Sequence, residues 1–315
     1  MPTKITNLLN FGDLPKGYYG KESPIVILPV PYDGTSTWGK GADKGPDAII
    51  EASANMELYD IETDSEVYKK GIFTDTPIAE RSSPEKMADA VYTRVKEHLN
   101  NNKFVVLLGG EHSVTIGCAK AYAEHFKGKD NKGSSNQNNA VKNNTQTDDF
   151  CVLQLDAHSD MRQEYQDSKY NHACVMARVQ EMCPVVQVGI RSMDVSERKH
   201  IKKERVFFAK DIKDIYANKG TANDWIEMVV SKLGKKVYIT IDLDVLDPSI
   251  MPSTGTPEPG GLGWYDVLTL MKKVFEKKEV VGFDIVELAP NKQNKAPNFL
   301  AAKLVYSMLS YKFKN

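Results

Sequence analysis

The sequence has little of what would direct a protein of 315 residues to a membrane or a nucleic acid. No apolar run approaches the ~20 residues of a membrane span, and the first residues, Met1-Pro2-Thr3-Lys4-Ile5, lack the apolar segment of a secretion signal. The formal net charge of −1 provides no basic surface for nucleic acid or lipid head groups. We therefore expect a soluble, cytoplasmic protein without nucleic-acid or membrane partners.

Cysteine is also scarce. The chain has four cysteines, Cys118, Cys151, Cys174 and Cys183, and no pair has the C-x-x-C spacing. They lie in segments that we expect to be helix or strand, which is typical of reduced, packed thiols. Because Cys174 lies two residues from His172, a nucleophilic thiol is an alternative, but a different role for His172 is favoured below.

What the sequence does contain is an alternation of apolar strands and amphipathic helices, with 41% hydrophobic residues to form a core. Strands are predicted at 24–30, 71–74, 104–108, 151–155, 184–189, 205–208, 236–241 and 280–286. Helices are predicted at about 45–56, 84–101, 113–126, 173–182, 195–204, 222–233, 264–277 and 297–311. This βα alternation predicts one α/β domain over residues 1–315, a three-layer sandwich with a mostly parallel eight-stranded sheet in the middle.

One segment departs from this pattern. Residues 128–149 are almost all Asn, Lys, Gln, Ser, Thr and Gly, and such a composition cannot bury enough apolar surface to order itself. We expect a mobile surface insertion with no catalytic role.

The strand at 151–155 ends in three potential metal ligands, Asp156, His158 and Asp160. Side chains two residues apart in an extended backbone lie on the same face, so the three can converge just beyond the strand. The pattern is that of a divalent-cation site, although an Asp and a His that cap the next helix or turn would fit this triplet equally well.

Three further strands end in the same residue types. Gly109-Gly110-Glu111-His112-Ser113 follows the strand at 104–108, Asp242 and Asp244 follow 236–241, and Glu287 follows 280–286. Taken alone, His112 fits a packed histidine as well as a ligand. Ligands of parallel sheets bind beyond the carboxyl ends of the strands, so we expect all these side chains to meet there.

Charge balance favours two metal ions at this place. Four carboxylates, those of Asp156, Asp160, Asp242 and Asp244, cannot stay ionised together when buried unless cations accompany them. Two divalent ions would balance them, with histidines as neutral ligands. Imidazole and carboxylate ligands without thiolate suit manganese better than a structural zinc. Such a pair of ions generates a hydroxide nucleophile near neutral pH, which indicates hydrolysis of a carbonyl-like or amidine-like carbon, and Glu287 remains free to pair with a cation such as a guanidinium.

The motifs resemble those of the ureohydrolases, the family of arginase, agmatinase and relatives. The resemblance covers about residues 25–311 and rests on the Gly-Gly-Glu-His-Ser motif at 109–113, Asp-Ala-His-Ser-Asp at 156–160, the Asp242-Leu-Asp-Val-Leu-Asp-Pro run and Thr254-Gly-Thr-Pro. It implies an arginase-like fold and two manganese ions per chain. In that arrangement His112 and Asp160 hold one ion, His158 and Asp244 hold the other, and Asp156 and Asp242 bridge them.

The resemblance also implies roles for the remaining residues. Asp160 would hydrogen-bond the nucleophile, Glu287 would bind the guanidinium with Thr256 as its hydrogen-bonding neighbour, and His172 would carry a proton to the leaving amine. The products would be urea and an amine. Homo-oligomers of three or six chains are implied as well.

The substrate is a separate question. Arginases follow the Asp-Ala-His motif with groups that grip an amino acid, and this chain departs from that pattern at Met161-Arg162 and at Tyr170-Asn171-His172-Ala173-Cys174. It is more similar to bacterial and archaeal agmatinases, which favours agmatine, cleaved to putrescine and urea. Glu164, Asp167 or Glu258 is then a candidate partner for the ammonium of agmatine, the alternative being that these acids form a solvated rim.

Other readings use the same residues. A guanidinobutyrase, an arginase or a guanidine hydrolase would keep the metal core and differ in the loops near Trp38, Glu164 and Glu258. A related deacetylase would share the fold with a single metal ion. A non-catalytic relative kept for binding is the last alternative, although every ligand position is filled.

Overall fold

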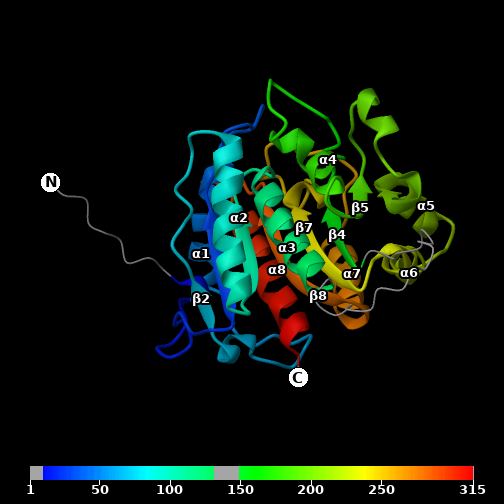
Figure 1. Cartoon of the computed structure of the whole chain (residues 1–315). Helices are drawn as coiled ribbons and strands as arrows, with labels where there is room; N and C mark the ends of the chain where they lie inside the picture. The colour runs from blue at the N-terminus through cyan, green and yellow to red at the C-terminus, as the bar shows by residue number, and fades with distance from the viewer. Residues whose placement is uncertain (1–9, 131–148, 315) are drawn as a thin grey trace, which may run out of the picture.

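The fold is built on one parallel sheet (Figure 1), and the computed structural model describes residues 10–130 and 149–314. The strands are β1 (Ile25–Val30), β2 (Ile72–Thr74), β3 (Phe104–Gly109), β4 (Phe150–Leu155), β5 (Val185–Ile190), β6 (Val206–Phe208), β7 (Lys236–Asp242) and β8 (Glu279–Val286). Their order in the sheet is β2-β1-β3-β8-β7-β4-β5-β6, and neighbouring strands pair in parallel. The predicted eight-stranded sheet is confirmed, and in the described residues it is parallel throughout.

Helices cover both faces of the sheet. They are α1 (Gly45–Ser53), α2 (Pro84–Asn100), α3 (Val114–Asp130), α4 (Val175–Gln180), α5 (Ala209–Ala217), α6 (Ala222–Lys232), α7 (Trp264–Lys277) and α8 (Ala296–Phe313). Residues of α2, α3 and α4 form one hydrophobic core with one face of the sheet, and α1 and α5–α8 form a second core with the other face. Figure 1 shows α2 and α3 side by side over the first face. The predicted three-layer arrangement is confirmed.

One predicted helix is wrong and one was missed. The segment predicted as a helix at 195–204 forms two short 3-10 turns, Val195–Lys199 and Lys203–Arg205. Its Glu197 is buried and accepts hydrogen bonds from Ser159 and from the Met161 amide, which ties the segment to the loop after β4 instead of letting it continue as a helix. The next helix, α5, begins directly after β6 and buries Ala209 and Ile212.

Two further expectations concern the polar insertion and the lack of a membrane span. The insertion predicted at 128–149 falls mostly on residues 131–148, which lie outside the described residues, and α3 continues through Asp130. Within the described part of the chain, no helix combines the length and the apolar character that a membrane crossing requires.

The strand order places the predicted ligands together. The four strands that end in acids or histidine, β3, β8, β7 and β4, are consecutive neighbours in the middle of the sheet. Leu155 pairs with Ile241 and Asp242 pairs with Val286, so Asp156, Asp242 and Glu287 leave the sheet at nearly the same level. The loop after β1 borders this group because β1 lies next to β3.

Candidate metal centre and active site

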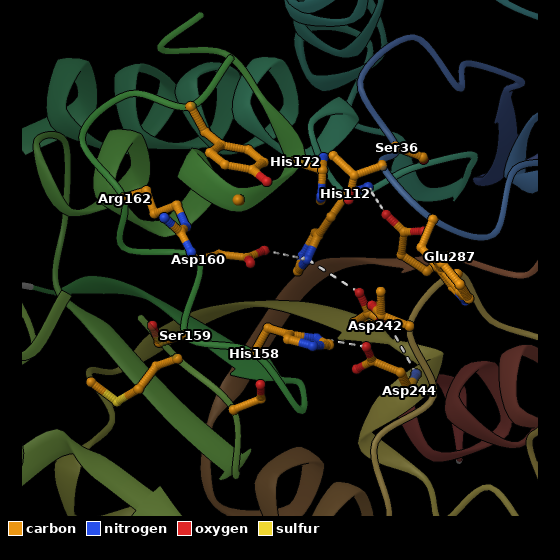
Figure 2. Close-up of a pocket in the computed structure, with 18 of the residues that line it drawn as sticks. Ser36, His112, His158, Ser159, Asp160, Arg162, His172, Asp242, Asp244 and Glu287 are labelled. Atoms are coloured by element: carbon orange, nitrogen blue, oxygen red, sulfur yellow. Dashed lines mark hydrogen bonds and ion pairs between the residues drawn. The ribbon is translucent and has the colours of Figure 1, made fainter. Parts of the chain in front are cut away.

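A cavity of about 320 Å³ opens at the carboxyl ends of the central strands (Figure 2). The side chains of its floor are almost completely buried except that of His158, which is partly exposed, and its rim includes exposed ones such as Trp38, which is 82% exposed. The residues around the floor are those predicted as metal ligands, His112, Asp156, His158, Asp160, Asp242 and Asp244. The structure therefore brings all six predicted ligand residues together.

Asp156 lies between the two histidines. Its Oδ2 is 3.1 Å from Nδ1 of His112, and its Oδ1 is 3.7 Å from Nδ1 of His158. Two groups able to hold a cation share this carboxylate: His112 with Asp156 and Asp242, and His158 with Asp156 and Asp244, each with ligand atoms within 4.8 Å of one another. A carboxylate shared between two such groups can hold two ions close together.

Asp160 and Asp244 each approach one histidine. Oδ2 of Asp160 is 3.1 Å from Nδ1 of His112, and Oδ2 of Asp244 is 2.8 Å from Nδ1 of His158. Oδ2 of Asp242 is 3.6 Å from the same His112 nitrogen. In these contacts His112 approaches Asp156, Asp160 and Asp242, and His158 approaches Asp156 and Asp244.

The orientation of His112 indicates which nitrogen is available to a cation. Thr240 donates its hydroxyl hydrogen to Asp284, at 2.6 Å, so its oxygen accepts from Nε2 of His112, at 2.9 Å. In the neutral form of the ring, which is the one that binds a metal, Nδ1 then carries the lone pair and points at the carboxylates. It is a buried nitrogen with no aligned hydrogen bond within the described residues, and a divalent cation among these acids would satisfy it. The donor set thus fits a metal.

Electrostatics lead to the same conclusion. Burial and the neighbouring charge of Asp156 raise the pKa of Asp160 to about 7, and burial together with Asp244 and Asp156 raises the pKa of Asp242 well above its usual value. Burial alone would lower the pKa of His112, yet Asp156 and Asp160 raise it well above the usual range. In the absence of a cation, the buried acids therefore bind protons or pair with a protonated histidine. A metal ion at this place would supply that positive charge instead.

Glu287 is positioned by an unusual backbone. Its φ is +67°, and that of Asp160 is +52°, a region that non-glycine residues adopt rarely and that is enriched at functional sites. Oε1 of Glu287 accepts a hydrogen bond from the His112 amide at 2.7 Å, which leaves Oε2 toward the cavity beside Gly255. Burial and the charge of Glu111 raise the pKa of Glu287 well above its usual value. A cationic group bound beside Glu287 would therefore stabilise its ionised form.

His172 lines the cavity with a neutral ring. Burial, followed by the charges of His112 and His158, lowers the pKa of His172 to about 4. Cys174, the alternative nucleophile, is buried, and burial together with the charge of Asp160 raises its pKa to about 11. A protonated, buried thiol does not act as a nucleophile, so that alternative is not supported.

The predicted substrate-binding residues divide into two groups. Thr256 lines the cavity beside Glu287. Glu164 is exposed and lies outside the lining, and Oε1 of Glu258 approaches Nε2 of His158 at 3.9 Å from the side. Two further acids line the cavity: Asp194, which pairs with Arg162 at 3.4 Å, and the buried Glu197.

Sequence reasoning missed the layer beneath the ligands. Gln154 donates to Oδ2 of Asp156 at 2.6 Å, and Thr240 and Asp284 orient His112. Each is a buried polar residue inside an otherwise apolar strand, and Gln154 and Thr240 each lie two positions before a predicted ligand. That interruption of an apolar run was the available signal.

Comparison with known proteins agrees with this geometry. The profile of the arginase family matches residues 23–310. The chain belongs to the arginase family. It is 37% identical over 300 residues to N(1)-aminopropylagmatine ureohydrolase of Synechocystis sp., which covers 92% of this chain and 89% of the relative. It is 38% identical over 311 residues to the protein of the same name from Thermus thermophilus, covering 96% and 94%.

A solved structure of an arginase-family member extends the comparison to three dimensions. The agmatine ureohydrolase of Thermoplasma volcanium superposes with a TM-score of 0.80 at 32% identity, covering 98% of this chain and 96% of that one. The arginase-like fold and the resemblance to ureohydrolases are thus confirmed, and this arginase-family chain is a hydrolase of the ureohydrolase class.

Proposed function

We propose that the chain is a binuclear metal ureohydrolase that cleaves a guanidino compound to urea and an amine. The observation that carries the proposal is the carboxylate of Asp156 between His112 and His158, with the buried Glu287 on the same cavity. We assign His112 and Asp160 to one ion, His158 and Asp244 to the other, and Asp156 and Asp242 to both. Oxygen and imidazole ligands without thiolate favour manganese, two ions per chain.

The residues of the chain then have separate tasks. Bound divalent ions would lower the pKa of a water molecule and so supply the nucleophile. Asp160 would accept a hydrogen bond from that nucleophile and so orient it toward the substrate. Glu287 and Thr256, which line the cavity, would bind the guanidinium and hold it in place during the reaction. His172, whose ring is neutral in this site, would first take up the proton that the attacking water releases and would then give it to the leaving amine.

Agmatine is the substrate that we propose from the resemblance to agmatinases. N1-aminopropylagmatine is a second candidate because the relatives that are 37% and 38% identical carry that name. Both candidates end in ammonium groups. The acids that we propose for such a tail are Asp194, which lines the cavity and pairs with Arg162, and Glu258, which approaches His158; Glu164 lies outside the lining.

A urea-release assay across agmatine, N1-aminopropylagmatine, arginine, guanidinobutyrate and guanidine, with added manganese, tests the proposal. Release from either polyamine precursor, with a higher kcat/KM than from arginine, supports it. Release only from arginine, guanidinobutyrate or guanidine would assign the chain to the corresponding alternative. No release from any of them would refute the function.

Metal content separates the remaining alternative. A deacetylase of the same fold would contain about one ion per chain, so a metal count near two by elemental analysis supports the ureohydrolase. We also propose a homotrimer or homohexamer in the cytoplasm, which the mass of the native protein by light scattering and cell fractionation would test.

A further inference from the structure

Glu111 is a buried carboxylate that the proposed mechanism does not use. It follows Gly110 in the turn after β3 and is 0% exposed, although it lies next to His112 and not in the cavity lining. Its donors come mainly from the loop after β1. The amides of Thr35 and Ser36 donate to Oε2 at 2.6 and 2.8 Å, and the hydroxyls of Thr35 and Ser113 donate to Oε1 at 2.6 and 2.5 Å. The carboxylate thus holds a loop that is 76 residues away in the sequence.

The approach of the two loops depends on Gly110. A Cβ at this position would lie 1.9 Å from the carbonyl oxygen of Tyr32, so a larger residue cannot occupy it without moving the backbone. Two backbone bonds close the junction: the Gly110 amide donates to Val30, and the Glu111 amide donates to Tyr32, both at 2.8 Å. The loop that carries Thr35 is therefore fixed against the turn that carries Glu111.

The hydroxyl of Thr35 connects Glu111 to His172. A hydroxyl has one hydrogen, and Thr35 gives it to Glu111, whose carboxylate can only accept. The Thr35 oxygen is then left to accept two bonds from His172, one from its amide at 2.9 Å and one from ring Nδ1 at 3.2 Å. The ring nitrogen that donates is Nδ1–H, so the lone pair of the neutral ring is on Nε2.

We propose that Glu111 and Thr35 are positioning residues that fix the tautomer and the orientation of His172. Their effect is to present the basic Nε2 to the reacting centre and to prevent the ring from flipping to the Nε2–H form. This inference rests on the proposed function, because it gives His172 the task of moving a proton. It adds that the carboxylate of the 109–113 motif acts on His172 through Thr35, in addition to lying next to a metal ligand.

Thr35→Val tests the relay, by which we mean the hydrogen bonds that lead from Glu111 through Thr35 to His172. The substitution keeps the side-chain shape and the backbone amide and removes only the hydroxyl. We expect kcat to fall on the order of tenfold or more, because orientation of a catalytic group contributes by such factors. KM and metal content should stay as in the wild type. Thr35→Ser, which keeps the hydroxyl, should restore most of the lost rate. Thr93→Val is a matched control, since that hydroxyl bonds the Asp89 carbonyl on the exposed side of α2.

A double-mutant cycle distinguishes positioning from a merely structural role. In a His172→Asn background, Thr35→Val should cause no further loss of kcat, since the group that it positions is gone. An equal loss in both backgrounds, or a loss that appears in KM or in metal content, would overturn the relay. If the wild type releases urea but His172→Asn keeps its full rate, the proton-transfer role of His172 fails and the relay with it.

A spectroscopic readout does not need activity. In protein loaded with diamagnetic zinc and labelled with ¹⁵N-histidine, the His172 ring should report the Nδ1–H tautomer, with the signal assigned by its loss in His172→Asn. In Thr35→Val the ring should shift toward the Nε2–H tautomer. An Nε2–H ring in the wild type would overturn the inference even if the ureohydrolase activity is as proposed, and a wild type that releases no urea would refute the function alone.

Discussion

Nε2 of His112 lies 2.9 Å from the hydroxyl oxygen of Thr240, which in turn donates to Asp284 at 2.6 Å. The three residues belong to different strands or the loops that follow them, β3, β7 and β8, and Asp284 is also held by Tyr238 and Thr115. A chain of hydrogen bonds of this kind fixes the tautomer of a metal-binding histidine and raises its basicity. The orientation of His112 is therefore determined from beneath the cavity.

Removing the middle of that chain should weaken metal binding. We expect Thr240→Val to lower the affinity for one ion about 10–100-fold, the range seen when an outer partner of a metal ligand is lost. Isothermal titration of metal-depleted protein with manganese would measure it. Thr269→Val, which removes a hydroxyl bonded to the Tyr265 carbonyl on α7, serves as the control and should bind normally. Unchanged affinity in Thr240→Val would contradict the role of this contact.

Asp156 and Asp244 should differ in their effect on metal content. Asp156 approaches both histidines, whereas Asp244 approaches only His158 of the two. Asp156→Asn should therefore reduce the content to below about one ion per chain, and Asp244→Asn should keep about one, because a shared carboxylate supports both ions. Elemental analysis after dialysis measures the content. Retention of both ions in Asp156→Asn would count against the bridging assignment.

Much of the site could be predicted because it is encoded at strand ends. Asp156, Asp160, Asp242 and Asp244 each follow an apolar run, and the side-chain alternation of a strand puts residues two apart on one face. A local pattern thus identifies both the residue and its direction. The order that makes β3, β8, β7 and β4 neighbours in the sheet depends on long-range pairing, which no local pattern specifies.

The supporting residues could not be predicted in the same way. Thr35 and His172 are 137 residues apart, and nothing in either segment specifies the other. The buried Glu197 is a second case: its neighbours predict a solvated helix, while its carboxylate is used to hold Ser159 and Met161. Contacts of this type arise where loops pack against one another. Loop residues follow no regular spacing in the sequence, so their contacts cannot be predicted from it.

Asp75 should contribute to stability far from the metal site. Its burial would raise its pKa, but hydrogen bonds from His98 and Arg94, both at 2.8 Å, lower the pKa well below its usual value. An acid with a lowered folded-state pKa stabilises the fold above its unfolded pKa of about 4 and loses that contribution as the pH falls further. We expect Asp75→Asn to lower the free energy of unfolding by about 1.5–3 kcal/mol at pH 7.

The pH dependence is the specific part of that prediction. The difference between wild type and Asp75→Asn should narrow as the pH is lowered from 4 to 3, when measured by urea unfolding at each pH. Asp89→Asn, at an exposed position on α2, should show almost no difference at any pH. A gap for Asp75→Asn that stays constant down to pH 3 would mean that the carboxylate charge is not what stabilises the fold.

Unlike Asp75, Glu287 should destabilise the fold when it is charged, although the same charge serves substrate binding. Burial and the charge of Glu111 raise its folded-state pKa, so the stability that this group contributes is lost as the pH rises through that value. Glu287→Gln keeps an oxygen for the His112 amide and removes the charge. We expect kcat/KM to fall about 10²–10³-fold with the metal content unchanged, because a preorganised charge at the substrate is lost.

The same substitution should raise the melting temperature of the substrate-free protein, and the gain should widen from pH 5 to pH 8 because only the wild type carries the unfavourable buried carboxylate. Differential scanning calorimetry of metal-loaded protein measures both values. Glu279→Gln, at the exposed start of β8, is the matched control and should change neither stability nor kcat/KM. If Glu287→Gln instead lowers the melting temperature while it abolishes activity, then Glu287 stabilises the turn after β8, and the predicted cost of its buried charge is wrong.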